Sequence, residues 1–357
     1  MVLHPTERST HAAPWLQAFG QFAEQLGFVK WGIAPAIDAS GFSDLVKWID
    51  SGYAAEMDYF ANRLDAYRHP RGVMAGTKSI VVMAYPYPAD PPDDSATSAV
   101  KVARYAWPGA DYHDTLHHKM KQLKRLIRDQ SPTTNVRGCV DTAPLLEREL
   151  AVLAGLGWRG KNTLLLNRQL GSYFFLCCLL LDVELPYDDP YQTSHCGTCT
   201  ACLDACPTDA FPAPGVLDAN RCISYLTIEH REAIPMDLQR SIGEWAFGCD
   251  ICQEVCPWNR KPSRHSDTSD QDAPLRRVSL EWFFDADEDQ FRQRFRKTPL
   301  WRTRLRGIQR NAAIVLGNQG QRASLPALRK GASSDDEIVA ATCRWAIQQI
   351  EQTNPNV

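Results

Sequence analysis

The spacing of its cysteines constrains this 357-residue chain more than any other feature. A first run has gaps of two, two and three residues and ends before Pro207, with cysteines at Cys196, Cys199, Cys202 and Cys206. A second run ends in the same way before Pro257, at Cys249, Cys252 and Cys256, and Cys222 lies between the runs. Bacterial ferredoxins ligate iron–sulfur clusters with this spacing, and the fourth cysteine of such a run ligates the other cluster.

These eight thiols are enough for two [4Fe-4S] clusters. The interleaved pattern predicts Cys196, Cys199, Cys202 and Cys256 on one cluster, and Cys206, Cys222, Cys249 and Cys252 on the other. Structural zinc is the alternative, but a third evenly spaced cysteine and a Cys-Pro end exceed what a zinc site requires. We expect the remaining cysteines, Cys139, Cys177, Cys178 and Cys343, to be small buried hydrophobes.

The rest of the composition is that of an ordinary globular protein, with 44% hydrophobic and 23% charged residues. The N-terminus has no apolar segment typical of a secretion signal, and cysteines at cluster spacing favour a reducing compartment. The longest apolar run, Tyr173 to Leu181, is too short to cross a bilayer. We therefore expect a cytoplasmic protein without a membrane segment.

The chain is long enough for several domains, and its patterns divide it into three. Residues 1–184 alternate helical and strand patterns and predict an α/β domain, with helices over residues 16–26 and 113–129 and strands over 79–85, 135–140 and 173–181. Residues 185–260 form the predicted ferredoxin-like domain, and residues 274–357 a helical one. Polar segments at 88–98 and 261–273 are typical of a surface loop and a linker.

Gly155, Gly157 and Gly160 form a GxGxxG, but they do not predict a dinucleotide site. That fingerprint requires a strand before it and a helix after it. Here a helical pattern precedes the glycines and an apolar run follows them. A tight helix-to-strand connection is the better interpretation.

The helical tail is strongly basic. Between Phe291 and Ser334 there are eleven Lys or Arg residues and no Asp or Glu, although the whole chain has a net charge of -3. A solvated face is the plain interpretation, but so complete an imbalance favours contact with a polyanion. The predicted phosphate contacts are Arg292, Arg294, Arg296, Lys297, Arg302, Arg304, Arg306 and Arg310. Two helical stripes in the tail are typical of a HEAT-like repeat, with a plain helical bundle as the alternative.

Several motifs outside the cysteine runs resemble the epoxyqueuosine reductase family. They include VDTAPLLER at 140–148, GLGWRGKNT at 155–163 and GSYFFL at 171–176. Arg104-Tyr105-Ala106, Asp111-Tyr112-His113 and the RN-x-x-I-x-LGN pattern beginning at Arg310 belong to the same set. The resemblance covers essentially the whole chain, with one departure: the 107–110 loop is one residue longer than usual and lacks the usual arginine before Asp111.

The resemblance implies a cobalamin-dependent oxidoreductase that reduces epoxyqueuosine to queuosine at the wobble position of tRNA. It implies that cobalamin binds in the N-terminal α/β domain and that both clusters pass electrons to it from an external low-potential donor. Carried over by position, the proton donor is Asp141, and the corrinoid neighbours are Arg63, Tyr105, Asp141, Lys161, Ser172, Cys249 and Asp250. We expect a monomer.

Local sequence gives Asp141 two possible roles. An Asp ahead of Thr142 and Pro144 is a helix-capping signature. An acid at the end of a predicted strand could instead project into a cleft and protonate an epoxide oxygen, and burial against the corrin would then favour its neutral form. Two other functions compete with the reductase: an exported reductive dehalogenase, which the N-terminus disfavours, and an electron-transfer protein, which would not need the basic tail.

Overall fold

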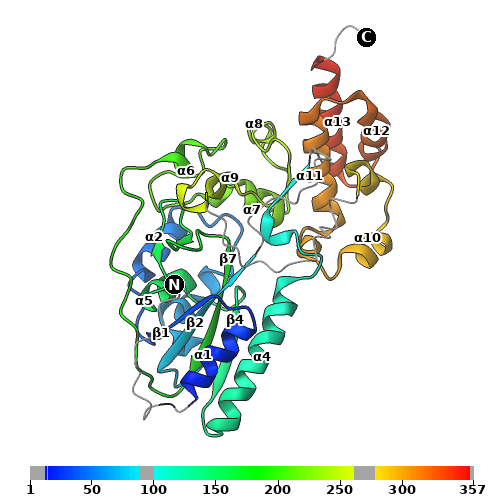
Figure 1. Ribbon diagram of the computed structural model, residues 1–357. Helices are drawn as coiled ribbons and strands as arrows, with labels where there is room; N and C mark the ends of the chain where they lie inside the picture. The colour runs from blue at the N-terminus through cyan, green and yellow to red at the C-terminus, as the bar shows by residue number, and fades with distance from the viewer. Residues whose placement is uncertain (1–12, 14, 88–99, 261–277, 354–357) are drawn as a thin grey trace.

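The computed structural model describes residues 13, 15–87, 100–260 and 278–353. Its first part is built on a four-stranded antiparallel sheet with the strand order β1-β2-β7-β4 (Figure 1). The strands are Lys30–Pro35 (β1), Ser79–Pro86 (β2), Val136–Val140 (β4) and Phe174–Leu181 (β7). Strand β7, which confirms the strand predicted over 173–181, pairs with both β2 and β4 and is therefore an inner strand of the sheet. The predicted segments 88–98 and 261–273 lie outside the described residues.

Successive residues of a strand point to opposite faces, so this apolar sheet is covered on both sides. On one face Val81 and Met83 pack with helices Leu16–Gln25 (α1) and Tyr112–Gln130 (α4), and both helices confirm the predicted ranges. On the other face Val82 and Ala84 pack with Leu64–Arg68 (α3) and Glu147–Leu153 (α5). Helix α2 spans Phe42–Asp50. The predicted α/β layer architecture is therefore present.

Gly155 and Gly157 connect α5 to the short strand Trp158–Arg159 (β5), and Gly160 follows that strand, which pairs with Leu165–Leu166 (β6). The motif thus contains the predicted helix-to-strand connection. Gly157 is required here because a Cβ would lie 2.0 Å from the carbonyl oxygen of Leu166. The motif serves chain packing.

The cysteine-rich segment contains short elements, which are α6 (Ala201–Asp204), α7 (Ile223–Ile228), α8 (Met236–Gln239), β8 (Trp245–Phe247) and α9 (Ile251–Glu254). Strand β8 pairs in parallel with Lys101–Val102 (β3), which precedes the 3-10 turn Arg104–Ala106. The segment is therefore joined to the first region by backbone hydrogen bonds as well as by chain connection.

The tail contains helices α10 (Glu288–Phe295), α11 (Arg304–Gln319), α12 (Leu325–Ala332) and α13 (Glu337–Thr353). Helices α11 and α13 approach closely at Gly317, where a Cβ would lie 2.9 Å from the Cα of Ala346. The apolar core of these helices is continuous with buried residues of α7 and β8. Within the described ranges, no helix has both the length and the apolar character needed to span a membrane.

The RN-x-x-I-x-LGN motif of α11 fastens the tail to the cysteine-rich segment. Arg310, only 2% exposed, donates hydrogen bonds to the backbone carbonyls of Leu226 (2.7 Å), His230 (3.0 Å) and Glu232 (2.7 Å). Asn311 donates to the carbonyls of Thr227 and Ala246 in the same way. The prediction that Arg310 contacts phosphate is therefore wrong, because its guanidinium is buried and satisfied by the protein.

Candidate active site

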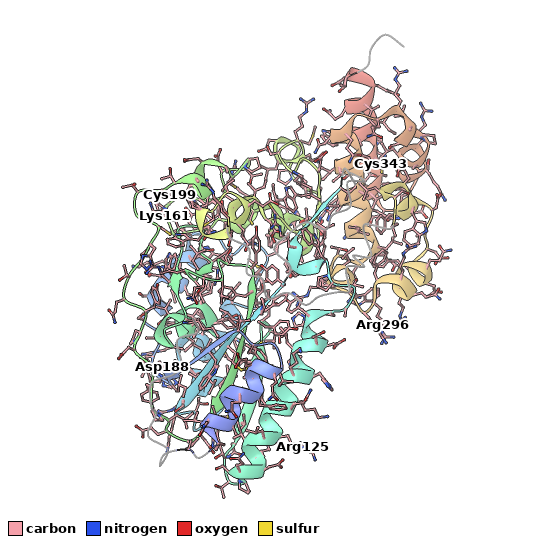
Figure 2. All side chains as sticks on the ribbon, in the orientation of Figure 1. Arg125, Lys161, Asp188, Cys199, Arg296 and Cys343 are labelled. Atoms are coloured by element: carbon pink, nitrogen blue, oxygen red, sulfur yellow. The ribbon has the colours of Figure 1, made fainter. Side chains whose placement is uncertain are left out.

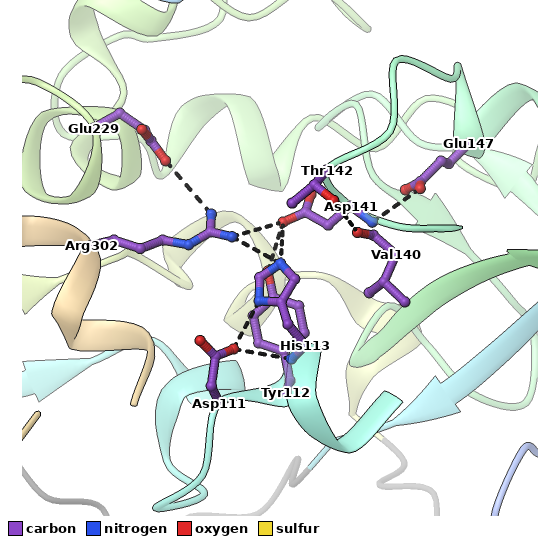
Figure 3. A network of polar contacts seen from close by, with 9 residues as sticks. All are labelled: Asp111, Tyr112, His113, Val140, Asp141, Thr142, Glu147, Glu229 and Arg302. Atoms are coloured by element: carbon purple, nitrogen blue, oxygen red, sulfur yellow. Dashed lines mark hydrogen bonds and ion pairs between the residues drawn. The ribbon is translucent and has the colours of Figure 1, made fainter. Parts of the chain in front are cut away.

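Asp141 lies directly after β4, where the sheet meets the cysteine-rich segment and the tail (Figures 1 and 3). Its backbone adopts φ +55°, a left-handed conformation that is uncommon for non-glycine residues. The Tyr112 hydroxyl donates a 2.6 Å hydrogen bond to Asp141 Oδ2, and the backbone amide of Asp141 donates to Glu147 Oε1 at 3.1 Å. Helix α5 has Leu146 at its N-cap, with no side-chain cap bond. The capping interpretation of Asp141 is thus wrong.

His113 links Asp141 to a second carboxylate (Figure 3). Its Nδ1 lies 2.8 Å from Asp111 Oδ1, and its Nε2 lies 3.5 Å from Asp141 Oδ2. The Tyr112 ring stacks between His113 and Phe175, with centroid distances of 4.0 and 4.2 Å. These contacts fix the imidazole plane, so the site has an oriented acid–base pair rather than a single carboxyl group.

The fourth member comes from the basic tail. Arg302, in the 3-10 turn Pro299–Thr303, places Nη2 2.9 Å from His113 Nε2 and 3.6 Å from Asp141 Oδ2. Its Nη1 lies 3.7 Å from Glu229 Oε1. The amide of Asp111 also donates to the carbonyl of Lys297 at 2.7 Å. The tail therefore closes onto the reaction site, which local sequence did not indicate.

The pKa values of the ionisable side chains in this site are shifted in different directions. Burial raises the pKa of Asp141, but hydrogen bonds from His113 and Tyr112 and the charge of Arg302 outweigh it and lower that pKa to about 2. Burial lowers the pKa of His113, whereas its bonds to Asp111 and Asp141 raise it to about 9. Burial and the neighbouring Asp141 raise the pKa of Glu147 to about 8. The protein side chains alone therefore favour the ionised form of Asp141, and the expectation that burial against the corrin favours its neutral form stays a prediction.

Aromatic rings line the approach to Asp141. Tyr105 contacts Tyr112 and Phe175 edge-on, at centroid distances of 5.8 and 6.4 Å. Tyr173 lies under the Arg104 guanidinium at 4.6 Å, and its hydroxyl is buried without a hydrogen-bond partner in the described part of the chain. Aromatic rings therefore lie beside a carboxylate that is 52% exposed, and the buried Tyr173 hydroxyl is left unsatisfied.

Of the other predicted corrinoid neighbours, Ser172 and Asp250 are buried, Lys161 is half-buried and Arg63 is exposed. Ser172 donates to Gln253 and accepts from Asn259, and Asp250 accepts from the Arg104 amide at 2.7 Å. Lys161 binds the carbonyls of Gly197 and Cys199, next to the first cysteine run (Figure 2). Arg63 lies near Gly72 and Asp65. Only Tyr105 lies against the Asp141 group, and Ser172 and Asp250 are already satisfied by protein partners.

The charges of the cluster cysteines act on one another in two sets. Burial and then the charges of Cys256, Cys196 and Cys199 raise the pKa of Cys202. Burial raises the pKa of Cys252, with Cys222 and Cys249 next in effect. Cys222 and Cys249 in turn each interact with Cys206. These interactions follow the two interleaved sets that the spacing predicts. Within the described ranges, however, no group of three or more His, Cys, Asp or Glu side chains is arranged to hold a metal ion, so the ligand sets stay a prediction. Cys139, Cys177, Cys178 and Cys343 are buried, as expected.

The predicted phosphate contacts separate into exposed and engaged side chains. The exposed ones are Arg292, Arg294, Arg296, Lys297 and Arg304, and Figure 2 shows Arg296 projecting from the outer side of the tail. Arg306 pairs with Asp336 at 2.7 Å, and Arg302 is turned toward Asp141. The sequence contains no acid within the basic stretch, but folding brings acids from other segments to it.

The fold and the cysteine groups define a double-cluster iron–sulfur oxidoreductase. Residues 195–259 match the family model of a 4Fe-4S double cluster binding domain, which supports two [4Fe-4S] clusters. Residues 68–142 match the model described as epoxyqueuosine reductase QueG, DUF1730.

Relatives of known identity extend this match over nearly the whole chain. The epoxyqueuosine reductase of Pseudomonas aeruginosa is 39% identical over 94% of this chain and 95% of the relative. That of Escherichia coli is 37% identical over 95% and 90%. The chain therefore belongs to the epoxyqueuosine reductase family.

Solved structures agree with the sequence relatives. A crystal structure of epoxyqueuosine reductase with an epoxyqueuosine-modified tRNA-Tyr stem loop superposes with a TM-score of 0.84 at 29% identity, covering 94% of this chain and 89% of that one. The Bacillus subtilis enzyme, with its catalytic aspartate loop swung out of the active site, also gives 0.84, at 28% identity, covering 94% and 90%.

Proposed function

We propose that this protein reduces epoxyqueuosine to queuosine in tRNA, in the cytoplasm. The epoxide accepts two electrons and two protons, its oxygen leaves as water, and an alkene remains. The observation that carries the proposal is the position of an oriented carboxylate–imidazole pair, Asp141 with His113, at the junction of the sheet and the double-cluster segment. Family membership over the whole chain supports the substrate.

In this proposal Asp141 delivers the proton to the epoxide oxygen, directly or through one water. An alkoxide leaves poorly, so a positioned acid accelerates ring opening by roughly 10² to 10⁴. The low pKa of Asp141 means that the carboxylate must first be protonated. The Tyr112 hydroxyl is nearer, but its raised pKa makes it a poor acid, so His113, 3.5 Å away, is the group we propose to supply that proton. The exposed edge of Asp141 leaves room for a substrate.

The cofactor we propose is cobalamin, beside the ring wall formed by Tyr105, Tyr112 and Phe175. Reduction of an epoxide needs a centre capable of two-electron chemistry, and cobalamin supplies it where cubanes pass one electron at a time. The ring wall, the exposed Asp141 and the unsatisfied Tyr173 hydroxyl support this location. Tyr105 would contact the corrin, whereas Ser172 and Asp250 would act on it through Gln253 and Arg104.

We further propose the interleaved ligation for the two [4Fe-4S] clusters. Cys196, Cys199, Cys202 and Cys256 would hold one and Cys206, Cys222, Cys249 and Cys252 the other. Cys199 is exposed, whereas Cys249 adjoins Asp250 near the ring wall. An external low-potential donor would thus deliver electrons at the first cluster, and the second would pass them toward the cofactor.

For tRNA we propose that the exposed basic residues Arg292, Arg294, Arg296, Lys297 and Arg304 contact the phosphate backbone. Phosphate contacts position a nucleic acid without reading its bases. An unpaired anticodon base can be splayed out and stacked on aromatic rings, so the modified base would enter beside Asp141. A monomer with a HEAT-like helical tail is the form in which we expect this binding.

The deciding experiment is anaerobic turnover of epoxyqueuosine-containing tRNA by the reconstituted protein, with and without cobalamin. We expect queuosine only when cobalamin, both clusters and a chemical reductant are present. Turnover without cobalamin would remove the cofactor proposal and leave the reaction intact. Absence of queuosine in the complete mixture, with iron and cobalamin both bound, would overturn the proposed reaction.

A further inference from the structure

Arg302 makes a contact that its position in a basic tail does not explain. Its guanidinium lies within 2.9 Å of His113 Nε2, and the His113 side chain is only 13% exposed. A guanidinium has donors and no acceptor. The contact is therefore a hydrogen bond only if Nε2 carries a lone pair and no proton.

The other nitrogen of the same ring is already assigned. Asp111 Oδ1, 2.8 Å from Nδ1, also accepts the His113 backbone N–H at 3.0 Å. A carboxylate at this position orients the ring with its proton on Nδ1. The Arg302 contact thus requires a neutral imidazole, and it opposes the carboxylates of Asp111 and Asp141, which favour the imidazolium and raise the pKa of His113 to about 9.

Asp141 favours the opposite state. Its Oδ2 lies 3.5 Å from the same Nε2 and would accept a hydrogen bond from an imidazolium. Nε2 cannot carry a proton and accept one from Arg302 at the same time. The two neighbours therefore compete for one atom, and the position of Arg302 decides which wins.

We propose that Arg302 is a positioning residue that controls whether His113 carries its second proton. With the guanidinium on Nε2, the His113–Asp141 pair holds no transferable proton. When the guanidinium withdraws, Nε2 takes up a proton from solvent and can pass it to Asp141. This inference deepens the proposed function and names the residue that loads its acid.

Withdrawal has a structural route. Arg302 belongs to the turn Pro299–Thr303, between the exposed cations of α10 and helix α11, and its side chain is 34% exposed. Phosphate binds guanidinium groups strongly. A tRNA backbone held by the neighbouring cations would compete with His113 for Arg302, so substrate binding would load the acid.

The ionisable groups that surround His113 and Asp141 leave Arg302 as the cation that acts on both of them. The carboxylates facing it are Asp111, Asp141, Glu147 and Glu229. The phenols are Tyr59, Tyr67, Tyr105 and Tyr112, whose pKa values are all raised, first by burial. Apart from His113 itself, Arg302 is the cation that acts on both His113 and Asp141.

The test is the protonation midpoint of His113 in the holoenzyme, measured by hydrogen–deuterium exchange at the imidazole C2 position with mass spectrometry. Removing a cation at this distance raises a neighbouring pKa by about 1 unit or more. We expect Arg302→Gln to raise the His113 midpoint by about 1 pH unit. Arg304→Gln, an exposed neighbour on Trp301, is the matched control, and His117 and His118 are internal references.

The same variant should change the pH profile of turnover. If the protonated His113–Asp141 pair is the acid, the alkaline limb of the turnover profile should move to higher pH in Arg302→Gln, together with the His113 midpoint. The limb of Arg302→Lys should lie between those of the wild type and Arg302→Gln. A merely structural Arg302 would lower turnover equally at every pH. An unchanged His113 midpoint in Arg302→Gln would overturn the inference even in an active enzyme, whereas a shifted midpoint without queuosine formation would overturn only the proposed reaction.

Discussion

The reaction region and the basic tail use charge in opposite ways. At the end of β4, His113 lies within hydrogen-bond or ion-pair distance of both Asp111 and Asp141, and the pKa values of His113 and Asp141 depart strongly from the ordinary ones. In α10, Arg292 and Arg296 are exposed. Charged side chains in mutual contact shift one another's pKa values and so tune proton transfer. Solvated charges on an exposed helix instead attract a polyanion over a distance.

The basic stretch is itself divided by burial. Arg310 supports the fold, Arg302 belongs to the reaction region, and only the part around α10 has the exposure that a binding surface needs. Identical residue types in one tail thus have three roles. The comparison teaches that charge density in a sequence indicates a kind of partner but does not say which charges meet it.

The largest effect should come from Asp141→Asn. The amide keeps the shape but cannot release a carboxylic proton, so turnover should fall by roughly 10² to 10⁴. Single-turnover formation of queuosine under anaerobic conditions measures it, with cobalamin, iron and tRNA binding unchanged. Asp114→Asn, one exposed acid along α4, is the control. Near-normal turnover of Asp141→Asn would assign the proton to another group.

Next is Cys222→Ala, which tests the most isolated ligand of the interleaved assignment. We expect iron per chain to fall from about eight to about four, with one cluster signal retained in electron paramagnetic resonance. Cys178→Ala, a buried thiol of β7, should leave the iron content unchanged. Full iron content in Cys222→Ala would remove this cysteine from the ligand set.

On the side of the tail, Arg310→Met should destabilise the fold rather than weaken tRNA contacts. It leaves the carbonyls of Leu226, His230 and Glu232 buried with fewer donors, which costs roughly 2 to 4 kcal/mol. Denaturant unfolding measures the loss, and Arg304→Met is the exposed control. An unchanged unfolding free energy, together with weaker tRNA binding, would restore Arg310 as a phosphate contact.

The smallest effect should come from the double variant Arg292→Gln with Arg296→Gln. If each side chain neutralises one phosphate, the slope of log affinity against log salt should decrease by about 1.5 in magnitude. The paired change of Arg125 and Arg128 to Gln, on the exposed side of α4, should leave that slope unaltered. An equal slope for both double variants would place the tRNA away from α10.

Local patterns sufficed for much of the architecture. Helix α4 has a strong apolar periodicity and strand β7 is a continuous apolar run, so the ranges of both follow from the sequence. Asp141 could be found because it ends a strand and belongs to a family motif. Its partner Arg302 is 161 positions further along the chain than Asp141, and no local signal links the two.

The sequence by itself determined the cluster chemistry and the family, because ligand spacing and motif order are properties of the chain. Only the tertiary structure decided which charges work together, since pKa values and hydrogen bonds depend on distances between segments remote in sequence. It showed that Arg302, predicted to contact tRNA, lies against His113 beside Asp141, and that Arg310 is buried in the core. It also placed His113, Tyr112 and Arg302 around Asp141, and these three side chains together hold the pKa of its carboxyl at about 2.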